Sequence, residues 1–272
     1  MADVLISTPS LESGSFMTVT SARQFDKLAV FEAHVLSYLR RVKEYHEFVF
    51  TDVPPSWGQA ILRLIDEKIA SRKSYNTTSR SLSIRVMPTE IQNCIQDWLL
   101  NHDVTREEQL LLHGIVGTTL EFKYGPYTGS TKEPDFFFRV NGHILPTLAV
   151  ECGWSESGAP LLDGMNMLLV GGDGSIKVVI IVEWTRLQGG RVSGTVELFM
   201  RDRNGMPRLV QSETVFPPPA TASSQRLGIR RCDLFGPAML AGRDGNDVLY
   251  LDIEQLRDHA ARNLGFMNLV PA

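Results

Sequence analysis

The sequence predicts an α/β (α+β) protein with a mixed sheet, in which residues 105–185 run helix, strand, strand, strand, helix, strand. Two patterns predict this class. Several short segments alternate apolar and polar residues with a period of two, as half-buried strands do. The segment KVVIIVEWT at 177–185 is almost continuously apolar, which is typical of a strand buried on both faces.

The composition is that of an ordinary globular protein, with 43% hydrophobic and 21% charged residues in a chain of 272. The formal net charge of −4 gives no global basic field for a nucleic acid, although a local basic groove can exist on an acidic protein. The three cysteines are far apart and lack CxxC spacing, which favours a reducing compartment over a disulfide framework or zinc knuckle. The first residues show no secretory signal, and no apolar run approaches the length of a membrane span. We therefore expect an intracellular protein of the cytoplasm or nucleus, with no membrane partner; the oligomeric state stays open.

Four segments follow from the order of patterns along the chain. Residues 1–25 are rich in Ser and Thr and are expected to form a mobile tail. Residues 26–104 carry two helical patterns, one alternating strand at 82–86 and a third helix after Pro88, and are expected to form a helical lead-in with one strand. Residues 105–185 form the core, and residues 186–272 form a β-hairpin extension and a C-terminal helix packed on the core.

The core elements can be placed one by one. A capping box of Thr105 and Glu108 begins the first helix. Strands are expected at 117–124, 135–140 and 146–152, with the Asn141-Gly142 turn between the last two. A helix at 159–169 and the apolar strand at 177–185 complete the order.

Two carboxylates in this hairpin are the candidate site. If the connecting loop centres on residue 143, Asp135 lies across from Glu151 on the same face of the sheet. Directly opposed like charges are destabilising and need compensation, which a hard divalent cation supplies. The alternative is that Asp135 merely begins a strand after Pro134 and that Glu151 pairs with a lysine or arginine, the commoner situation for acidic residues.

The motifs around this pair resemble a known family. KEPD at 132–135, followed sixteen residues later by ECG at 151–153, is similar to the PD-(D/E)XK restriction-endonuclease-like superfamily, in a branch of bacterial and fungal relatives. SIRVMP at 83–88 and FKYGPYTGST at 122–131 also look like the fungal group. The resemblance covers roughly residues 80–185 and implies a restriction-endonuclease-like αβββαβ core.

The same resemblance implies a chemistry. Asp135 and Glu151 would bind Mg²⁺ or Mn²⁺ with the main-chain carbonyl of Cys152. The metal would activate water for attack on a phosphodiester. Glu107 and Glu108 precede the first strand, where related nucleases sometimes place an extra acidic ligand, but carboxylates stabilised by the helix dipole are commoner there.

The family's lysine is missing from its usual place. Gly153 stands two residues after Glu151, and Met167 stands where some relatives carry a lysine in the following helix. Lys132 and Lys177 are the possible replacements, and Lys132 is the better candidate because it lies nearer to the acidic pair in sequence. A solvated surface lysine is the alternative for each.

Two functions therefore compete. The first is a Mg²⁺-dependent nuclease that hydrolyses phosphodiester bonds of DNA or RNA. The second is a catalytically degenerate nuclease fold that binds nucleic acid or protein, and the missing lysine favours it. A weaker third possibility uses the β-rich region at 191–251 as a docking surface for a partner.

Overall fold

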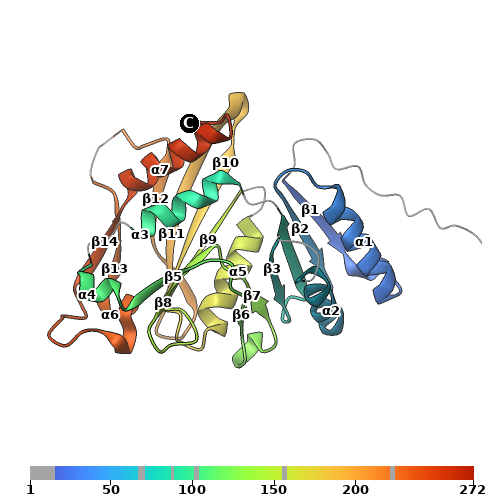
Figure 1. Ribbon diagram of the computed structural model, residues 1–272, viewed down its shortest axis with the longest axis horizontal. Coiled ribbons are helices and arrows are strands. Elements are labelled where there is room, and N and C mark those ends of the chain that lie inside the picture. The colour runs from blue at the N-terminus through green and yellow to red at the C-terminus, as the bar shows by residue number, and fades with distance from the viewer. Residues whose placement is uncertain (1–15, 67–70, 87–88, 101–103, 155–157, 221–223) are drawn as a thin grey trace, which may run out of the picture.

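The computed structural model confirms a mixed α/β fold and describes residues 16–66, 71–86, 89–100, 104–154, 158–220 and 224–272 (Figure 1). The strands form two large sheets and one two-stranded sheet, with helices packed on the faces of the large sheets. Among the described residues, no helix combines the length and the apolar character needed to span a membrane.

The first sheet has the strand order β1-β2-β4-β3-β7-β6. Its strands are β1 (Met17–Ser21), β2 (His46–Thr51), β4 (Ser81–Val86), β3 (Ser71–Asn76), β7 (Thr131–Lys132) and β6 (Leu120–Glu121). Only β1 and β2 run parallel; the other neighbours are antiparallel.

One face of this sheet is apolar and the other polar. Helices α1 (Leu28–Arg41) and α2 (Pro55–Asp66) cover the apolar face, where Phe48, Tyr75 and Ile84 are buried. Their strand neighbours point the other way because successive side chains alternate between faces. The opposite face therefore carries Glu47, Ser74, Arg85 and other polar residues.

The expected helical lead-in with one strand is wrong. Residues 26–104 contribute three strands, and β1 with the 3-10 turn Ala22–Gln24 lies inside the segment expected to be a mobile tail. Residues 1–15 of that tail lie outside the described residues. Helix α2 spans Pro55–Asp66, and residues 71–76, for which no strand was predicted, form β3, whose sequence SRKSYN has a single apolar residue, Tyr75. Pairing with β4, the next strand along the chain, and with the distant β7 makes this polar segment a strand, which its own periodicity does not reveal.

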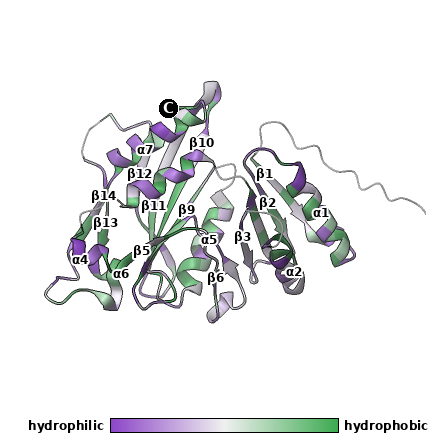
Figure 2. Cartoon of the chain, viewed as in Figure 1, coloured by the Kyte–Doolittle hydropathy of each residue, from purple (hydrophilic) through white to green (hydrophobic). Residues whose placement is uncertain are grey.

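The second sheet has the order β5-β8-β9-β10-β11-β12, and β15 also pairs with β11. The strands are β5 (Leu112–Ile115), β8 (Phe136–Val140), β9 (Leu148–Trp154), β10 (Val178–Arg186), β11 (Arg191–Arg201), β12 (Pro207–Phe216) and β15 (Val270–Pro271). Strands β9 and β10 are parallel, and α5 (Gly158–Gly171) connects them. Figure 2 shows β9 and β10 mainly in the hydrophobic colour and β3 in the hydrophilic one.

Helices bury both faces of the second sheet. Helix α5 covers one face, while α3 (Cys94–Leu100) and α7 (Ile253–Phe266) cover the other. The remaining elements are α4 (Arg106–Gln109), α6 (Arg231–Phe235), the pair β13 (Arg226–Arg230) and β14 (Val248–Asp252), and 3-10 turns at Glu90–Asn93, Gly125–Tyr127, Gln188–Gly190 and Gly236–Ala238. Asp252 caps α7 by accepting from the Glu254 N–H, and this helix is the C-terminal helix that the sequence predicted.

The predicted helix-strand-strand-strand-helix-strand order is present as α4, β5, β8, β9, α5 and β10. Its first strand is β5, so the expected core strand at 117–124 is wrong: residues 120–121 form β6 and belong to the first sheet. The expected hairpin at 191–216 is β11 and β12, which widens the same sheet.

Candidate metal and phosphate site

The register of β8 and β9 brings the two candidate carboxylates together. The strands are antiparallel with Phe136 opposite Val150, so Asp135, one residue further out, faces Glu151. The Asp135 N–H donates to the Val150 carbonyl at 3.1 Å. Both side chains alternate in step with Ala149, which packs in the cluster beneath α5. The register predicted from the hairpin loop is confirmed.

Lys132 reaches this pair from the first sheet. It lies on β7, opposite Ser74 of β3, and residues 132–135 cross from the first sheet to the second. Its Nζ lies 2.8 Å from Oε2 of Glu151, and both side chains are buried, with exposures of 8% and 0%. Gly164 of α5 makes room for this contact, since a Cβ there would lie 3.2 Å from the Lys132 Nζ.

Asp135 is held by donors from both sheets. The Cys152 N–H donates to its Oδ2 at 2.7 Å. Arg85 of β4 donates through Nη1 to Oδ1 at 3.0 Å and to Oδ2 at 2.9 Å, and Arg72 of β3 forms a second ion pair. The compensation expected from a divalent cation is supplied here by two guanidinium groups.

The carbonyl of Cys152, the third expected metal ligand, is also hydrogen-bonded. It accepts from Arg85 Nη1 at 3.1 Å and from Gln92 Nε2 at 3.3 Å. The thiol points the other way, where Trp184 Nε1 donates to Sγ at 3.3 Å. Burial raises the pKa of the Cys152 thiol to about 11, so this residue offers its carbonyl and not a thiolate.

Glu151 has fewer partners than Asp135. Neither of its carboxylate oxygens has a hydrogen-bond partner among the described residues, and the Lys132 ammonium is its ion-pair partner. A fully buried carboxylate oxygen without a hydrogen bond is unfavourable, because the group has lost its water without gaining donors. Glu151 therefore has unused capacity for a cation.

Sequence reasoning missed the arginines of the site. Arg85 lies on the strand that was predicted at 82–86, but the alternation of that strand indicated only that Arg85 lies on its polar face. Arg72 lies on β3, which was not predicted as a strand. Burial lowers the pKa of Arg72 and raises that of the neighbouring Glu133.

The other candidates do not join the pair. Lys177 immediately precedes β10, four residues before Ile181, which pairs with Glu151; at about 3.3 Å per residue it is roughly 13 Å away along the strand. Met167 is buried beneath the second sheet, and Gly153 packs against Leu161, so no lysine stands at either family position.

Glu107 and Glu108 are also separate from the pair. Glu107 is exposed on α4. Glu108 accepts from Thr105 in the predicted capping box and forms an ion pair with Arg231, so both of its oxygens have structural partners. These contacts favour a structural role for Glu108 at the start of α4 over a role as an extra metal ligand.

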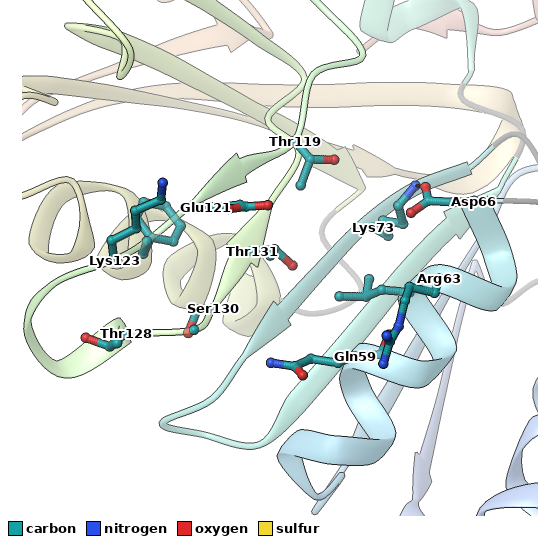
Figure 3. Close-up of a pocket in the computed structure, with 13 residues that line it drawn as sticks. Gln59, Arg63, Asp66, Lys73, Thr119, Glu121, Lys123, Thr128, Ser130 and Thr131 are labelled. Carbon is teal, nitrogen blue, oxygen red and sulfur yellow. Dashed lines mark hydrogen bonds and ion pairs between the residues drawn. The ribbon is translucent and has the colours of Figure 1, made fainter.

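Two cavities flank the first sheet. On its polar face, a cavity of about 400 Å³ lies between the sheet and the first turns of α5 and includes Lys132, Ser74, Ser83 and Glu47 in its lining. On the α2 side, a cavity of about 650 Å³ lies between α2 and the β6–β7 strands (Figure 3). Figure 3 shows Arg63 on α2 and Glu121 across the cavity from it. Neither Asp135 nor Glu151 lines this cavity.

No protein-family model and no curated protein matches the chain. Within the described ranges, no group of three or more His, Cys, Asp or Glu side chains converges in a way that could hold a metal ion. A metal at this site would thus depend on two carboxylates, a carbonyl and ligands from water or substrate.

Proposed function

We propose that the chain is a metal-dependent phosphodiesterase of the PD-(D/E)XK type acting on DNA or RNA, with Asp135, Glu151 and Lys132 as its catalytic residues. One observation carries the proposal: Lys132 Nζ lies 2.8 Å from Glu151, which stands directly opposite Asp135. The missing motif lysine is thereby replaced from the neighbouring sheet. An aspartate, a glutamate and a lysine are the residue types that the family's motif requires.

The donor set suits a hard divalent cation. Mg²⁺ binds through one or two carboxylates together with water and substrate phosphates, and Asp135, Glu151 and the Cys152 carbonyl are all oxygen ligands. When bound, such a cation lowers the pKa of water and stabilises charge on the phosphodiester. The acceptor positions that Glu151 has left beside the Lys132 ammonium are the part of the site that most favours it.

Lys132 would act through its position and charge. Its ammonium is buried beside Glu151, so its field is weakly screened and adds to the stabilisation of a negatively charged transition state. Gly164 permits this position, because a larger residue would press on the lysine. Asp135 is oriented by the Cys152 N–H, which fixes the carboxylate relative to β9.

The degenerate binding module is the second candidate, and a specific observation favours it. One nitrogen of Arg85 donates to both oxygens of Asp135 and to the Cys152 carbonyl. These are two of the three groups expected to hold the metal. If this guanidinium stays in place when the divalent cation is supplied, the fold binds without catalysing.

Cleavage and metal binding, measured together, test the proposal. Mg²⁺ or Mn²⁺ should support cleavage of single- or double-stranded DNA or RNA by the purified protein, whereas Ca²⁺ should bind and support it poorly. Asp135→Asn and Glu151→Gln should each abolish turnover, because each removes a charged ligand of the ion. Lys132→Met should reduce turnover strongly, and Lys177→Met, the matched control outside the site, should not.

The contrary outcomes are equally definite. A protein that cuts no substrate with either metal, yet binds nucleic acid or protein, supports the binding module. An absence of any calorimetric or thermal-shift signal with Mg²⁺, Mn²⁺ and Ca²⁺ would remove the metal site altogether. Circular dichroism of each variant separates lost chemistry from lost folding.

A further inference from the structure

The polar face of the first sheet carries basic and hydroxyl side chains in register. Arg72 pairs directly with Arg85 across β3 and β4, and Ser74 pairs with Ser83 in the next row that faces the same way. Lys132 of β7 extends that second row beyond Ser74. Five side chains that can bind an anion therefore lie on neighbouring positions of one face.

The two arginines lie directly opposite each other, an arrangement that like charges on a sheet normally avoid. Like charges directly opposed on a sheet repel, and burying them adds a desolvation cost. Arg85 is 6% exposed, and its Nε has no hydrogen-bond partner within the described part of the chain. Both guanidinium groups share Asp135, and Glu47 is 3.9 Å from Arg85. Their hydrogen-bonding capacity exceeds what Asp135 alone can satisfy.

These side chains line a small pocket beside a larger cavity. The pocket has a volume of about 10 Å³, room for about one water molecule, and is lined by Arg72, Arg85, Ser74, Ser83 and Lys132, together with neighbouring residues. It shares both serines and the lysine with the 400 Å³ cavity in front of α5. A cavity of that volume is in the range of about 300–1,000 Å³ that small-molecule sites occupy.

We infer that Arg72 and Arg85 are the phosphate-binding groups of this site, and that its substrate is a phosphodiester on a short or single-stranded chain, not a duplex. The inference rests on the proposed function. Guanidinium groups bind phosphate through paired N–H donors, and the serine hydroxyls can add to them. In the absence of ligands both guanidinium groups bind Asp135, and they turn to the phosphate when a divalent cation takes that carboxylate.

The lining of the 400 Å³ cavity favours a short or single-stranded substrate over a duplex. Apart from Lys132, it contains Ser, Thr, aliphatic residues and the carboxylates of Glu47 and Asp163. Duplex binding relies on many Lys and Arg contacts along the phosphate backbone. A cavity with one ammonium group and two acids cannot provide these contacts, but its 400 Å³ suit a single nucleotide. The phosphate of that nucleotide would reach Arg72 and Arg85 only when they leave Asp135, because the pocket they line now holds about one water molecule.

The exchange of partners couples the two ligands. Since the guanidinium groups and the cation compete for Asp135, the cation should strengthen phosphate binding, and phosphate should strengthen cation binding by the same factor. An arginine variant then has an unusual signature. Arg72→Gln should bind the phosphodiester more weakly and Ca²⁺ more tightly, whereas simple structural damage weakens both.

Calorimetry with the full-length protein tests this inference. The probes are a thymidine dinucleotide with a 5′ phosphate, a twelve-base-pair duplex, and Ca²⁺, which replaces Mg²⁺ so that nothing is cleaved. We expect Ca²⁺ to tighten dinucleotide binding at least about fivefold, the low end of typical coupling. Arg72→Gln should weaken dinucleotide binding and tighten Ca²⁺ binding. Arg63 is exposed on the opposite side of the sheet, so Arg63→Gln should change neither affinity.

Three results would overturn it, each in a distinguishable way. Ca²⁺ binding without dinucleotide binding removes the phosphate site and leaves the metal site standing. Duplex binding that is tighter than dinucleotide binding and falls steeply with salt contradicts the substrate class. Dinucleotide binding that is unchanged by Arg72→Gln, in a variant with wild-type circular dichroism, assigns the phosphate to other residues.

Discussion

Glu108 and Glu151 are two buried carboxylates, 1% and 0% exposed, whose surroundings differ in one respect. Glu108 accepts from the Thr105 N–H at 2.9 Å and from its hydroxyl at 3.1 Å, and its other oxygen pairs with Arg231. Glu151 pairs with the Lys132 ammonium, and neither of its oxygens accepts a hydrogen bond from a described residue. Burial alone therefore does not separate Glu108 from Glu151, the acid proposed to bind the cation.

The number of donors around the carboxylate makes the difference. A carboxylate with two oxygens offers about four acceptor positions, and the contacts of Glu108 use positions on both oxygens. An acid saturated in this way gains nothing from a metal. Glu151 has acceptor positions left, next to a second carboxylate, and that combination points to a ligand.

The largest expected effect is on stability, at the saturated acid. Glu108→Ala removes the capping box and leaves Arg231 without its buried partner, and breaking a buried pair costs about 3–5 kcal/mol. Urea unfolding should show this loss whether or not a divalent cation is present. Glu107→Ala, at the exposed neighbouring position, should stay within about 0.5 kcal/mol of the wild type. A similarly small change for Glu108→Ala would show that its contacts do not hold the fold.

A smaller effect is expected on the pH dependence of the free energy of unfolding. Burial raises the pKa of Glu108, but hydrogen bonds from Thr105 and Arg231 outweigh it, so the net pKa is lowered from its ordinary 4.5. The folded state therefore favours the charged form, and the stabilisation is complete above the unfolded pKa and lost as the pH falls through the folded one. The stability difference between wild type and Glu108→Gln should shrink as the pH falls below about 4.5. A difference that stays constant from pH 6 to pH 3 would contradict the role of the charge.

Local patterns carried the prediction of the hairpin that holds the carboxylate pair. Two short apolar segments flank the connection at residues 141–147, which includes the Asn141-Gly142 turn with Gly142 at a φ of 81°. Centring this connection on residue 143 predicted the register that the structure has. Lys132 was also foreseen, since it lies three residues before Asp135 in the KEPD motif. The capping box at Thr105 is similarly local.

The first sheet and its arginines could not be predicted in this way. Strand β3 is polar and is held by pairing with β4 and with β7, some sixty residues further along the chain, so its own sequence shows no strand period. The contact of Arg72 and Arg85 with Asp135 depends on how one sheet packs against the other. Sequence periodicity reports which face a residue occupies, not what the face meets.

The smallest expected change in stability belongs to the pair of Lys132 and Glu151, when both partners are replaced together. Replacing a buried ion pair by well-packed hydrophobic residues of similar volume is often neutral or stabilising, whereas removing one partner leaves a buried charge. Glu151→Leu alone should therefore lose on the order of 3 kcal/mol because the Lys132 ammonium is left unpaired, and the double variant Lys132→Met with Glu151→Leu should return to within about 1 kcal/mol of the wild type. The double-mutant cycle, measured by urea unfolding, isolates the pair from its surroundings. Turnover and Ca²⁺ binding should stay lost in the double variant although its stability returns. If stability fails to recover, Glu151 is a structural acid like Glu108; if Ca²⁺ binding survives without the carboxylate, the cation binds elsewhere.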